Sequence, residues 1–232
     1  MQKRRVLVLD IGGTSVKLHI AGMEEPLRVP SGRKMTPERM ISEIQKAAAS
    51  GRPEFDAISV GIPAPVVRGK VLREPANLGP GWTTFDFEKA AKKPIRLVND
   101  AAMQALGSYE GGTMLFLGLG TGLGAALVVD GVLAPLELAR LPYRRGEIED
   151  YVGVRGLEKY GKHGWRKHVE DVAVLLRAAF VADYVVLGGG NARRLKKLPE
   201  GCRRGSNALA FVGGERLWEN GARRRRVLHG GG

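Results

Sequence analysis

Short apolar runs separated by glycine turns dominate the start of the chain. Residues 5–9 form an apolar, β-branched run, and residues 15–21 alternate apolar and polar side chains with the period of a half-buried strand. Because a glycine turn separates these two runs, they predict a β-hairpin, and a third short strand is expected over residues 27–29. Thr36 then suits an N-cap and Pro37 the first helical position, so an amphipathic helix is predicted to begin there.

The succession of strands and helices continues through the first half and is repeated in the second half. Short apolar runs bounded by Gly, Pro or Asp predict buried strands, and apolar positions at helical spacing predict amphipathic helices. A chain of this kind is typical of an α/β fold. The predicted strands cover residues 56–61, 66–67, 71–72, 95–98, 114–117, 125–129, 132–133 and 184–187, and the predicted helices cover 101–107, 165–182 and 208–218.

Each half places a glycine-threonine turn inside a hairpin near its start, at residues 12–14 and 120–122. This repeat of plan without a repeat of sequence predicts two similar lobes facing a cleft, with two glycine loops converging on one ligand. We expect an N-terminal lobe over residues 1–108 and a C-terminal lobe over residues 109–232, with the last helix packing back on the first lobe.

The composition is that of a globular protein with one large domain or two small lobes. Of the 232 residues, 44% are hydrophobic and 26% charged, which argues against a disordered chain. The 33 glycines are about twice the usual share of ~7%, so many backbone positions need a positive φ or a close approach to a ligand. The lone cysteine, Cys202, can form neither an internal disulfide nor a cysteine-rich zinc site.

The net charge of +13 is concentrated in the second part of the chain. Residues 1–139 carry 17 Lys and Arg against 14 Asp and Glu, whereas residues 140–232 carry 20 against 10. A basic region of this kind indicates a polyanionic partner such as nucleic acid, polyphosphate or an acidic membrane surface, with a basic surface lacking any charged partner as the alternative. No apolar run is long enough for a membrane span or a signal peptide, so a soluble cytoplasmic protein is expected.

The first glycine loop, Asp10-Ile-Gly12-Gly13-Thr14, has the composition of a phosphate site. Its free N–H groups and the Thr14 hydroxyl can approach phosphate oxygens closely. A carboxylate beside a phosphate is repulsive unless a cation lies between them, so Asp10 predicts a phosphate-bound Mg²⁺ that it holds through water. Lys17, on the returning strand, is expected to belong to the same phosphate site. The alternative is a tight hairpin in which Asp10 only forms the turn.

Two further glycine loops follow in the second half. The second glycine loop, residues 118–124, lacks the Gly-Lys-Ser/Thr of a P-loop, and the chain returns from it as a strand rather than as the helix of a dinucleotide site. The third glycine loop, residues 188–191, follows a strand and suits an adenosine or phosphate contact at the start of a helix. The residues expected to bind phosphate or nucleotide here are Gly120, Thr121, Gly122, Gly124, Gly188, Gly189, Gly190 and Asn191.

Seven motifs stand in a characteristic order along the chain: Asp10-Ile-Gly-Gly-Thr14, Val60-Gly-Ile-Pro63, Asn77-Leu-Gly-Pro-Gly-Trp82, Val98-Asn-Asp100, Leu119-Gly-Thr-Gly-Leu-Gly124, Glu137 and Leu187-Gly-Gly-Gly190. This set resembles the sugar-kinase/actin superfamily, and within it the ROK family, most of all its short glucokinase and polyphosphate-glucokinase members. The resemblance implies a two-lobed α/β fold of the actin-like ATPase (ribonuclease H-like) type with a central cleft. It also implies a homodimer by analogy.

The resemblance assigns roles to individual residues. Asp100 would be the catalytic base that accepts the proton of the attacking sugar hydroxyl, a contribution worth about 10²–10⁴ in rate. Asn77 and Asn99 would hold sugar hydroxyls, because amides both donate and accept hydrogen bonds. Glu137 would bind further sugar hydroxyls. From the sequence alone, the alternative for Asp100 is an N-cap of the helix that follows it.

The chain departs from the family at one sugar-binding motif. The family usually has Glu-x-Gly-His, often followed by a zinc-binding cysteine cluster, whereas this chain has Glu137-Leu-Ala-Arg140 and a single cysteine. No zinc is therefore expected. Arg140 is larger than histidine and permanently charged. It could donate to a sugar hydroxyl, hold a sugar acid or phosphate, or point elsewhere, and this leaves the identity of the sugar open.

These features predict a hexose kinase that transfers a phosphoryl group from ATP, polyphosphate or both to the primary hydroxyl of glucose. The alternatives are a kinase for another sugar, such as N-acetylmannosamine or fructose, and a non-catalytic sugar or polyanion sensor. A repressor is not expected, because the first strand begins too early for a preceding DNA-binding domain. The tail Arg223–Arg226 is expected to be frayed. Candidates for a positive track along polyphosphate are Arg144, Arg145, Arg166, Lys167, His168, Arg193, Arg194, Lys196, Lys197, Arg203 and Arg204.

Overall fold

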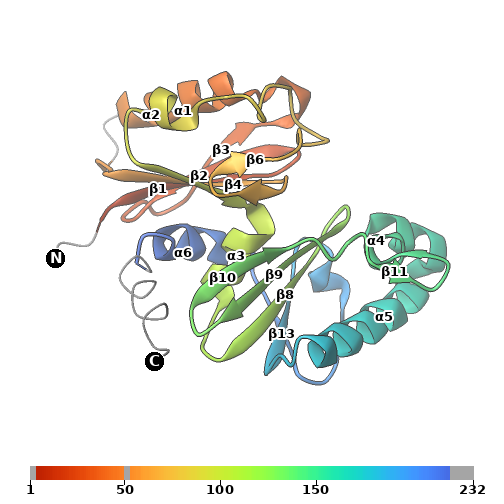
Figure 1. The fold of residues 1–232 in the computed structure, drawn as a ribbon. Helices are drawn as coiled ribbons and strands as arrows, with labels where there is room; N and C mark the ends of the chain where they lie inside the picture. Colours follow the sequence, from red (N-terminus) through yellow and green to blue (C-terminus); the bar gives the residue numbers. More distant parts are fainter. Residues whose placement is uncertain (1–3, 50–52, 220–232) are drawn as a thin grey trace, which may run out of the picture. The chain divides into compact units, whose positions relative to one another are not determined.

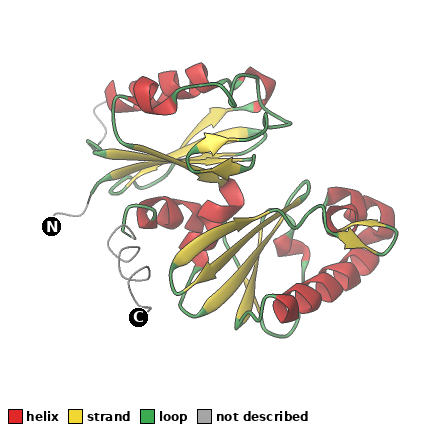
Figure 2. Cartoon of the chain, viewed as in Figure 1, coloured by secondary structure: helices red, strands yellow, loops and turns green. Residues whose placement is uncertain are grey.

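The computed structural model describes residues 4–49 and 53–219, so the predicted frayed tail Arg223–Arg226 lies outside the described residues. The elements form two compact units. Unit 1 contains the residues up to Met103 together with those from Gly214 onward, and unit 2 contains Gln104–Gly213. Each unit pairs a β-sheet with helices (Figures 1 and 2). Within the described ranges, no helix has both the length and the apolar content needed to cross a membrane.

Unit 1 is built on a five-stranded sheet with the order β3-β2-β1-β4-β7. The first three strands form the predicted antiparallel hairpin and its extension, whereas β4 and β7 run parallel to β1. Strands covered on both faces consist of continuous apolar runs, and β1 and β4 are buried at every position. The strands are β1 (Val6–Ile11), β2 (Ser15–Ile20), β3 (Leu27–Pro30), β4 (Ala57–Ile62) and β7 (Ile95–Asn99).

One face of this sheet packs against helices α1 (Pro37–Ala49) and α2 (Phe87–Ala91) (Figure 1). Helix α1 confirms the predicted amphipathic helix, and Met40, Ile41 and Ile44 of its apolar stripe are buried in the core. Helix α2 was not predicted, because a single turn and a half is too short to show helical periodicity. A small hairpin, β5 (Val66–Val67) with β6 (Lys70–Val71), confirms the predicted hairpin, with its second strand one residue earlier than the predicted 71–72.

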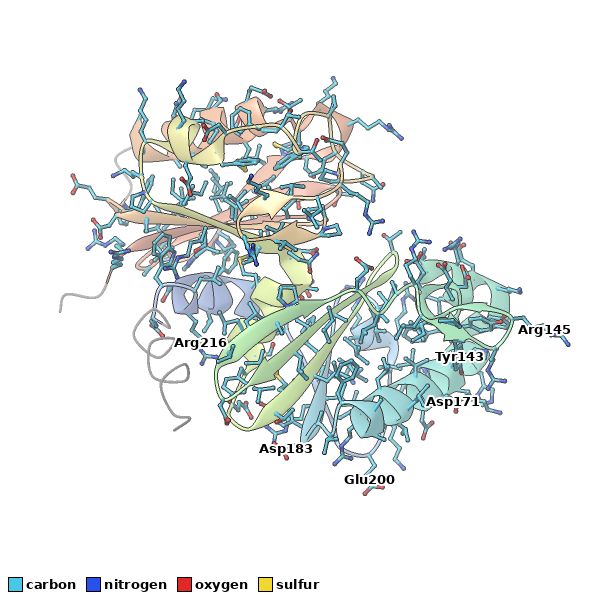
Figure 3. All side chains as sticks on the ribbon, viewed as in Figure 1. Tyr143, Arg145, Asp171, Asp183, Glu200 and Arg216 are labelled. Atoms are coloured by element: carbon cyan, nitrogen blue, oxygen red, sulfur yellow. The ribbon has the colours of Figure 1, made fainter. Side chains whose placement is uncertain are left out.

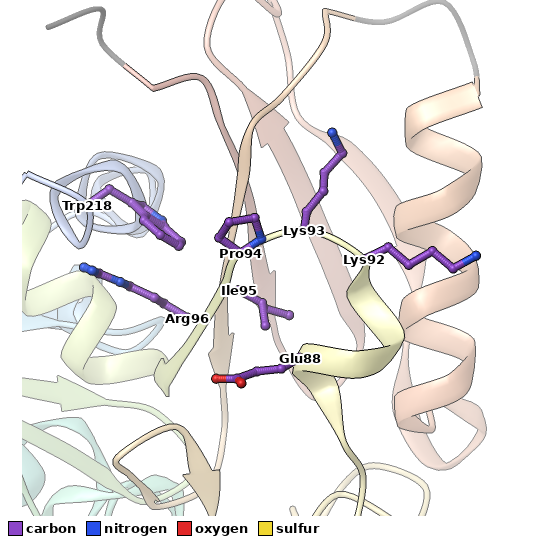
Figure 4. A pocket seen from close by; sticks show the side chains of 7 residues that line it. All are labelled: Glu88, Lys92, Lys93, Pro94, Ile95, Arg96 and Trp218. Atoms are coloured by element: carbon purple, nitrogen blue, oxygen red, sulfur yellow. The ribbon is translucent and has the colours of Figure 1, made fainter.

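The other face of the sheet holds the chain segment that begins at Gly214. The buried Ser59 hydroxyl donates to the Gly214 carbonyl at 2.7 Å and accepts from Trp218 Nε1 at 2.8 Å. A side chain at Gly214 would overlap Val8, so only glycine lets this backbone approach β1. The Arg96 guanidinium stacks 4.3 Å from the centroid of the Trp218 ring. Glu88, Lys92, Lys93, Pro94, Ile95, Arg96 and Trp218 line a pocket of about 540 Å³ there (Figure 4).

Unit 2 repeats the plan of unit 1 strand for strand. Its five-stranded sheet has the order β10-β9-β8-β13-β14, with an antiparallel β8–β9–β10 meander followed by two strands parallel to β8. The predicted structural repeat is therefore present in the strand order of the two sheets. The strands are β8 (Thr113–Leu119), β9 (Leu123–Val129), β10 (Val132–Leu136), β13 (Tyr184–Gly188) and β14 (Cys202–Arg204).

The long helix of unit 2, α5 (Val154–Ala179), begins well before the predicted residue 165. Its buried stripe includes Val169, Val172 and Leu176, as the periodicity predicted, although the helix ends at Ala179 rather than at residue 182. The preceding turns are mostly polar and are interrupted at Gly161, where the backbone is not helical, so periodicity does not reveal them. Other elements escaped prediction because they are too short to show a hydrophobic period. They are β11 (Pro142–Tyr143), β12 (Gly146–Glu147), β14, α4 (Ile148–Val152) and the 3₁₀ turns Gly32–Lys34 and Ala192–Arg194.

Two helices cross the boundary between the units in sequence. Helix α3 (Asp100–Ser108) begins in unit 1, and helix α6 (Leu209–Arg216) ends there. Within unit 2 the two helices are in close backbone contact, because a side chain at Gly107 would overlap the carbonyl group of Leu209. The predicted helices over residues 101–107 and 208–218 are both present.

Candidate active site

Hairpin β1–β2 holds the first glycine loop in a fixed shape. The Gly12 N–H donates to the Ser15 carbonyl at 2.9 Å, and the Ser31 hydroxyl donates to the Gly12 carbonyl at 2.6 Å. Gly13 and Thr14 are exposed at the tip of the loop. Their polar groups are therefore accessible to a phosphate, as the loop composition predicted.

Asp10 is a buried carboxylate at the carboxyl end of β1, with 6% of its surface exposed. The hairpin register pairs it with Lys17, whose Nζ lies 3.1 Å from Asp10 Oδ2. Burial of an unpaired carboxylate is costly, and this cation offsets the charge. The structure thus brings together the two charged residues that the sequence assigned to the first glycine loop.

Asp100 lies where β7 ends and α3 begins. Because β4 separates β7 from β1 and all three strands are parallel, Asp10 and Asp100 stand at the same end of the sheet. Asp100 is partly exposed. Removal of the carboxyl group from water, together with the negative charge of Asp10, raises the pKa of Asp100 to about 7. A carboxyl group that titrates near neutral pH has the properties of a general base.

The helix cap at the start of α3 is supplied by Asn99. Its Oδ1 accepts from the N–H groups of Ala101 and Ala102 at 3.0 and 3.3 Å, the pattern of an N-cap side chain. Its Nδ2 donates to the Ala64 carbonyl at 3.2 Å. Asp100 Oδ1 also accepts from the Ala101 N–H, at 2.8 Å. The sequence left open whether Asp100 is the N-cap of α3. In the structure Asn99 makes two of the three capping hydrogen bonds and Asp100 makes one. The sugar contact of Asn99 stays a prediction.

Two motif glycines allow close approaches around Asp100 and the first glycine loop. A Cβ at Gly61 would lie 2.5 Å from Met103 Cε and 3.3 Å from Asp100 Cα, so the absence of a side chain lets α3 lie against β4. A Cβ at Gly13 would lie 3.5 Å from Asn77 Cβ. The predicted sugar residue Asn77 is therefore a direct neighbour of the first glycine loop.

The second and third glycine loops lie against each other in unit 2. The Asn191 N–H donates to the Leu119 carbonyl at 3.0 Å, and Asn191 Nδ2 donates to the Gly120 carbonyl at 3.1 Å. Gly189 has a φ of +79°, and a Cβ there would lie 2.6 Å from the Leu119 oxygen. A side chain at Gly120 would meet nothing within 4 Å, so this part of the second loop faces open space. The two loops form one continuous, glycine-rich backbone surface.

Glu137 and Arg140 are exposed residues between β10 and β11, on either side of the buried Leu138 and Ala139. Arg140 Nη1 lies 2.9 Å from Glu147 Oε2 and 3.5 Å from Glu149 Oε1. A Cβ at Gly122 would lie 2.5 Å from Glu149 Oε2, so Glu149 contacts the second glycine loop. The sequence did not single out Glu149, because acidic residues in the first turn of a helix are ordinarily explained by the helix dipole.

The first glycine loop offers a place for the predicted Mg²⁺. Across residues 4–49 and 53–219, no group of three or more His, Cys, Asp or Glu side chains could hold a metal on its own. Mg²⁺ usually keeps several waters and binds through one or two carboxylates together with substrate phosphate oxygens. The buried Asp10 carboxylate beside the exposed tip of the first glycine loop fits that mode of binding.

Sequence comparison relates the chain to sugar kinases. Residues 6–134 match the ROK family. The chain is 26% identical over 216 residues to polyphosphate glucokinase of Mycobacterium leprae (strain TN), covering 83% of this chain and 65% of that protein. The chain thus spans slightly less than two thirds of that relative. It is also 25% identical over 213 residues to polyphosphate glucokinase of Mycobacterium tuberculosis (strain CDC 1551 / Oshkosh), covering 82% of this chain and 78% of the relative.

Structural comparison supports the predicted fold. The inorganic polyphosphate/ATP-glucomannokinase from Arthrobacter sp. strain KM superposes with a TM-score of 0.75 at 24% identity, over 93% of this chain and 99% of that one. The ROK hexokinase from Thermus thermophilus superposes with a TM-score of 0.66 at 23% identity, over 92% and 97%. The fold is accordingly the actin-like ATPase fold of the ROK kinases. With more than half of its length matching the family, the chain belongs to the ROK family.

Proposed function

We propose that the protein is a hexose kinase that transfers the terminal phosphoryl group of ATP, polyphosphate or both to the primary hydroxyl of glucose. The observation that carries this proposal is Asp100, whose pKa is raised to about 7 and which stands at the same end of the sheet as Asp10 and the first glycine loop. The relatives support it, because they are named polyphosphate glucokinases. A structural neighbour from Streptomyces griseus is a ROK family glucokinase in complex with glucose and AMPPNP, with a TM-score of 0.66 at 18% identity.

In the proposed reaction the primary hydroxyl oxygen of the sugar attacks the terminal phosphorus of the donor. A new O–P bond forms while the bond between that phosphorus and the leaving phosphate oxygen breaks, and the hydroxyl proton passes to the Asp100 carboxylate. With a pKa of about 7, this carboxyl group is substantially ionised at neutral pH and ready to accept the proton. When bound, Mg²⁺ supplies charge neutralisation for the transferring group. Asp10 would hold it through water, and Lys17 adds a positive charge beside it.

The sugar contacts in this proposal come from the motif residues. Asn77 lies against the first glycine loop, where its amide is suited to hold hydroxyls near the transferred phosphoryl group. Asn99 is anchored by its bonds to Ala64, Ala101 and Ala102, which hold its amide in one orientation. Glu137 would supply further contacts, as the family resemblance implies.

Cations around the third glycine loop support a polyanionic donor. Arg194 Nε donates to Asn191 Oδ1 at 3.1 Å, and Arg166 donates twice to the Arg194 carbonyl, at 3.0 and 2.6 Å. Such a cluster attracts polyphosphate by release of its counterions. Two members of the predicted track are paired elsewhere, Arg144 with Asp171 and Arg203 with Glu110. The exposed cations that follow the third loop are Arg193, Arg194, Lys196 and Lys197.

A sugar-by-donor panel tests this function. Glucose, fructose and N-acetylmannosamine are each incubated with Mg²⁺ and either ATP or polyphosphate at low salt, with wild-type protein and the Asp100→Ala variant. We expect a glucose phosphate from at least one donor and none from the variant. Absence of transfer to every sugar from both donors overturns the proposal, and so does equal turnover by the variant. Equal sugar binding by both proteins without turnover would instead identify a non-catalytic sensor.

A further inference from the structure

We propose that Arg140 is a positioning residue: it ties the segment 137–149 to the second glycine loop through Glu147 and Glu149, instead of recognising an anionic sugar. This inference rests on the proposed kinase function for its substrate consequence, but not for its structural part. It concerns a position at which the chain has arginine where its family usually has histidine.

The contacts of Arg140 run to carboxylates on both sides of the start of α4. Its Nη1 lies 2.9 Å from Glu147 Oε2, the last residue of β12, and 3.5 Å from Glu149 Oε1, in the first turn of the helix. Both contacts share the Nη1 nitrogen at the end of a long side chain, and the guanidinium charge does not titrate away. Histidine is too short to make both contacts from the same backbone position. The guanidinium group therefore bridges two points of the segment that a histidine would leave apart.

Glu149 passes this constraint on to the second glycine loop. Its other carboxylate oxygen, Oε2, would lie 2.5 Å from a Cβ at Gly122, so the carboxylate occupies the space above that glycine. Glu149 is also the most enclosed of the acids that Arg140 contacts, with 17% of its side chain exposed against 38% for Glu147. Backbone hydrogen bonds connect the same segments, since the Glu149 N–H donates to the Ala139 carbonyl at 3.1 Å and the Val154 N–H donates to the Thr121 carbonyl at 3.0 Å.

The local charge argues against an anionic ligand on Arg140. The guanidinium groups of Arg140 and Arg155 stand among the carboxylates of Glu147, Glu149 and Asp150, with Glu137 near enough to act electrostatically on Arg140. Around Arg140 itself, these four acids face two guanidinium groups, because Arg144 of the neighbouring turn pairs with Asp171 instead. A carboxylate or phosphate on the sugar would meet like charges there, which is unfavourable. The arrangement points to a sugar without an anionic group.

The structural part is tested by hydrogen exchange on the substrate-free protein. Arg140→Ala, Arg140→Lys and Arg140→His are compared with Arg144→Ala, a matched control whose arginine lies nearby in the turn between β11 and β12 but pairs with Asp171 at 2.9 Å. In Arg140→Ala and Arg140→His we expect exchange of the amides of residues 118–124 and 148–154 to quicken about two- to fivefold, the scale of an exposed ion pair. Arg140→Lys should fall between these variants and wild type. Equal exchange in Arg140→Ala and Arg144→Ala overturns the inference.

The substrate part is tested by kinetics. We expect Arg140→Ala to raise the KM for glucose about two- to fivefold with kcat nearly unchanged, and 1 M NaCl to raise the wild-type KM towards that of the variant, because salt screens exposed pairs. Glucuronate and glucose 1-phosphate should not compete with glucose. Competition by either anion that Arg140→Ala removes overturns the positioning role. A wild-type protein without kinase activity would end the proposed function, while the exchange experiment still decides the role of Arg140.

Discussion

The two units have the same strand order but carry their charges in different places. In unit 1, the ends of β1 and β7 hold Asp10 and Asp100, and Lys17 faces Asp10 across the hairpin. In unit 2, the second glycine loop contains no ionisable residue, and its charged neighbours belong to other segments, such as Glu149. One topology thus delivers two glycine loops at strand ends. The acids of unit 1 stand at strand ends, and burial together with Asp10 raises the pKa of Asp100 to about 7, whereas Glu149 of unit 2 comes from a helix and is paired with Arg140 and Arg155.

Removal of the Asp100 carboxylate should give the largest difference between the two units, measured as the rate of phosphoryl transfer. Asp100→Asn cannot accept the hydroxyl proton, so we expect the rate of phosphoryl transfer to fall by about 10²–10⁴. Single-turnover measurements with glucose and each donor provide the check. Asp130→Asn, in the turn between β9 and β10 of unit 2, is a matched loss of one carboxylate and should leave the rate unchanged. A rate loss below tenfold in Asp100→Asn would contradict the assignment of the base.

Glycine substitutions should separate the two loop systems next. Gly189→Ala combines a φ of +79° with a Cβ placed 2.6 Å from the Leu119 oxygen, so we expect the free energy of unfolding to drop by about 2–4 kcal/mol. Gly13→Ala places its Cβ 3.5 Å from Asn77, an ordinary contact, and should cost less than about 1 kcal/mol. Urea denaturation of both variants checks the difference. Similar losses in the two would show that the third glycine loop yields more readily than its contacts imply.

The pH dependence of stability should reveal the raised pKa of Asp100 in unit 1. The pKa of Asp100 is raised from 3.8 to about 7, so the folded state keeps the proton longer than the unfolded state. Between about pH 4 and pH 7 the unfolded state gives up this proton while the folded state keeps it, so the free energy of unfolding falls as the pH rises through this range. Asp100→Asn should therefore be more stable than wild type above pH 7, by about 1–4 kcal/mol, with no difference below about pH 4. Urea midpoints measured from pH 3.5 to pH 8.5 check this.

The smallest expected effect concerns the coupling of the two acids. Asp10 contributes to the raised pKa of Asp100 after the larger effect of burial, so Asp10→Asn should lower the pKa of Asp100 without returning it to its ordinary value. The difference in stability between Asp10→Asn and the double variant Asp10→Asn/Asp100→Asn should then develop at lower pH than in the wild-type background. An unchanged transition pH would mean that burial alone sets the pKa of Asp100.

Periodicity identified the long elements of the fold but not the short ones. Helix α1 was predicted because Met40, Ile41 and Ile44 mark one face over several turns. Helix α4 spans Ile148–Val152, which is too short for any period to emerge. The early turns of α5 were missed because they carry few apolar residues and a break at Gly161. Hydrophobic spacing reports burial, so elements that bury little leave little trace in it.

Some residues of the candidate site were likewise found from the sequence, whereas others were found only in the structure. The glycine loops, Asp10 and Asp100 were found from the sequence because their spacing and residue types are unusual for turns alone. Glu149 was not found, because its contact with Gly122 joins segments distant in the chain and nothing local marks it. The pairing of Arg140 with Glu147 and Glu149 likewise required the hairpin β11–β12 to fold back. The same hairpin brings Tyr143 close to Asp171 of α5, with Arg145 at its outer end (Figure 3).

Taken by itself, the sequence determined the long strands of both sheets, where the backbone turns without side chains, and which acids stand at strand ends, since these follow from local spacing and chain connectivity. The tertiary structure alone decided how those groups interact. The pKa of Asp100 is raised only in the folded chain, where water is removed from around its carboxyl group and where β1 and β7, on either side of β4, bring Asp10 and Asp100 to the same end of one sheet. Arg140 acquires its partners only when β12 and α4 return to it. Electrostatic interactions depend on the distance between charges and on their exposure to water, and neither can be read from the order of residues along the chain.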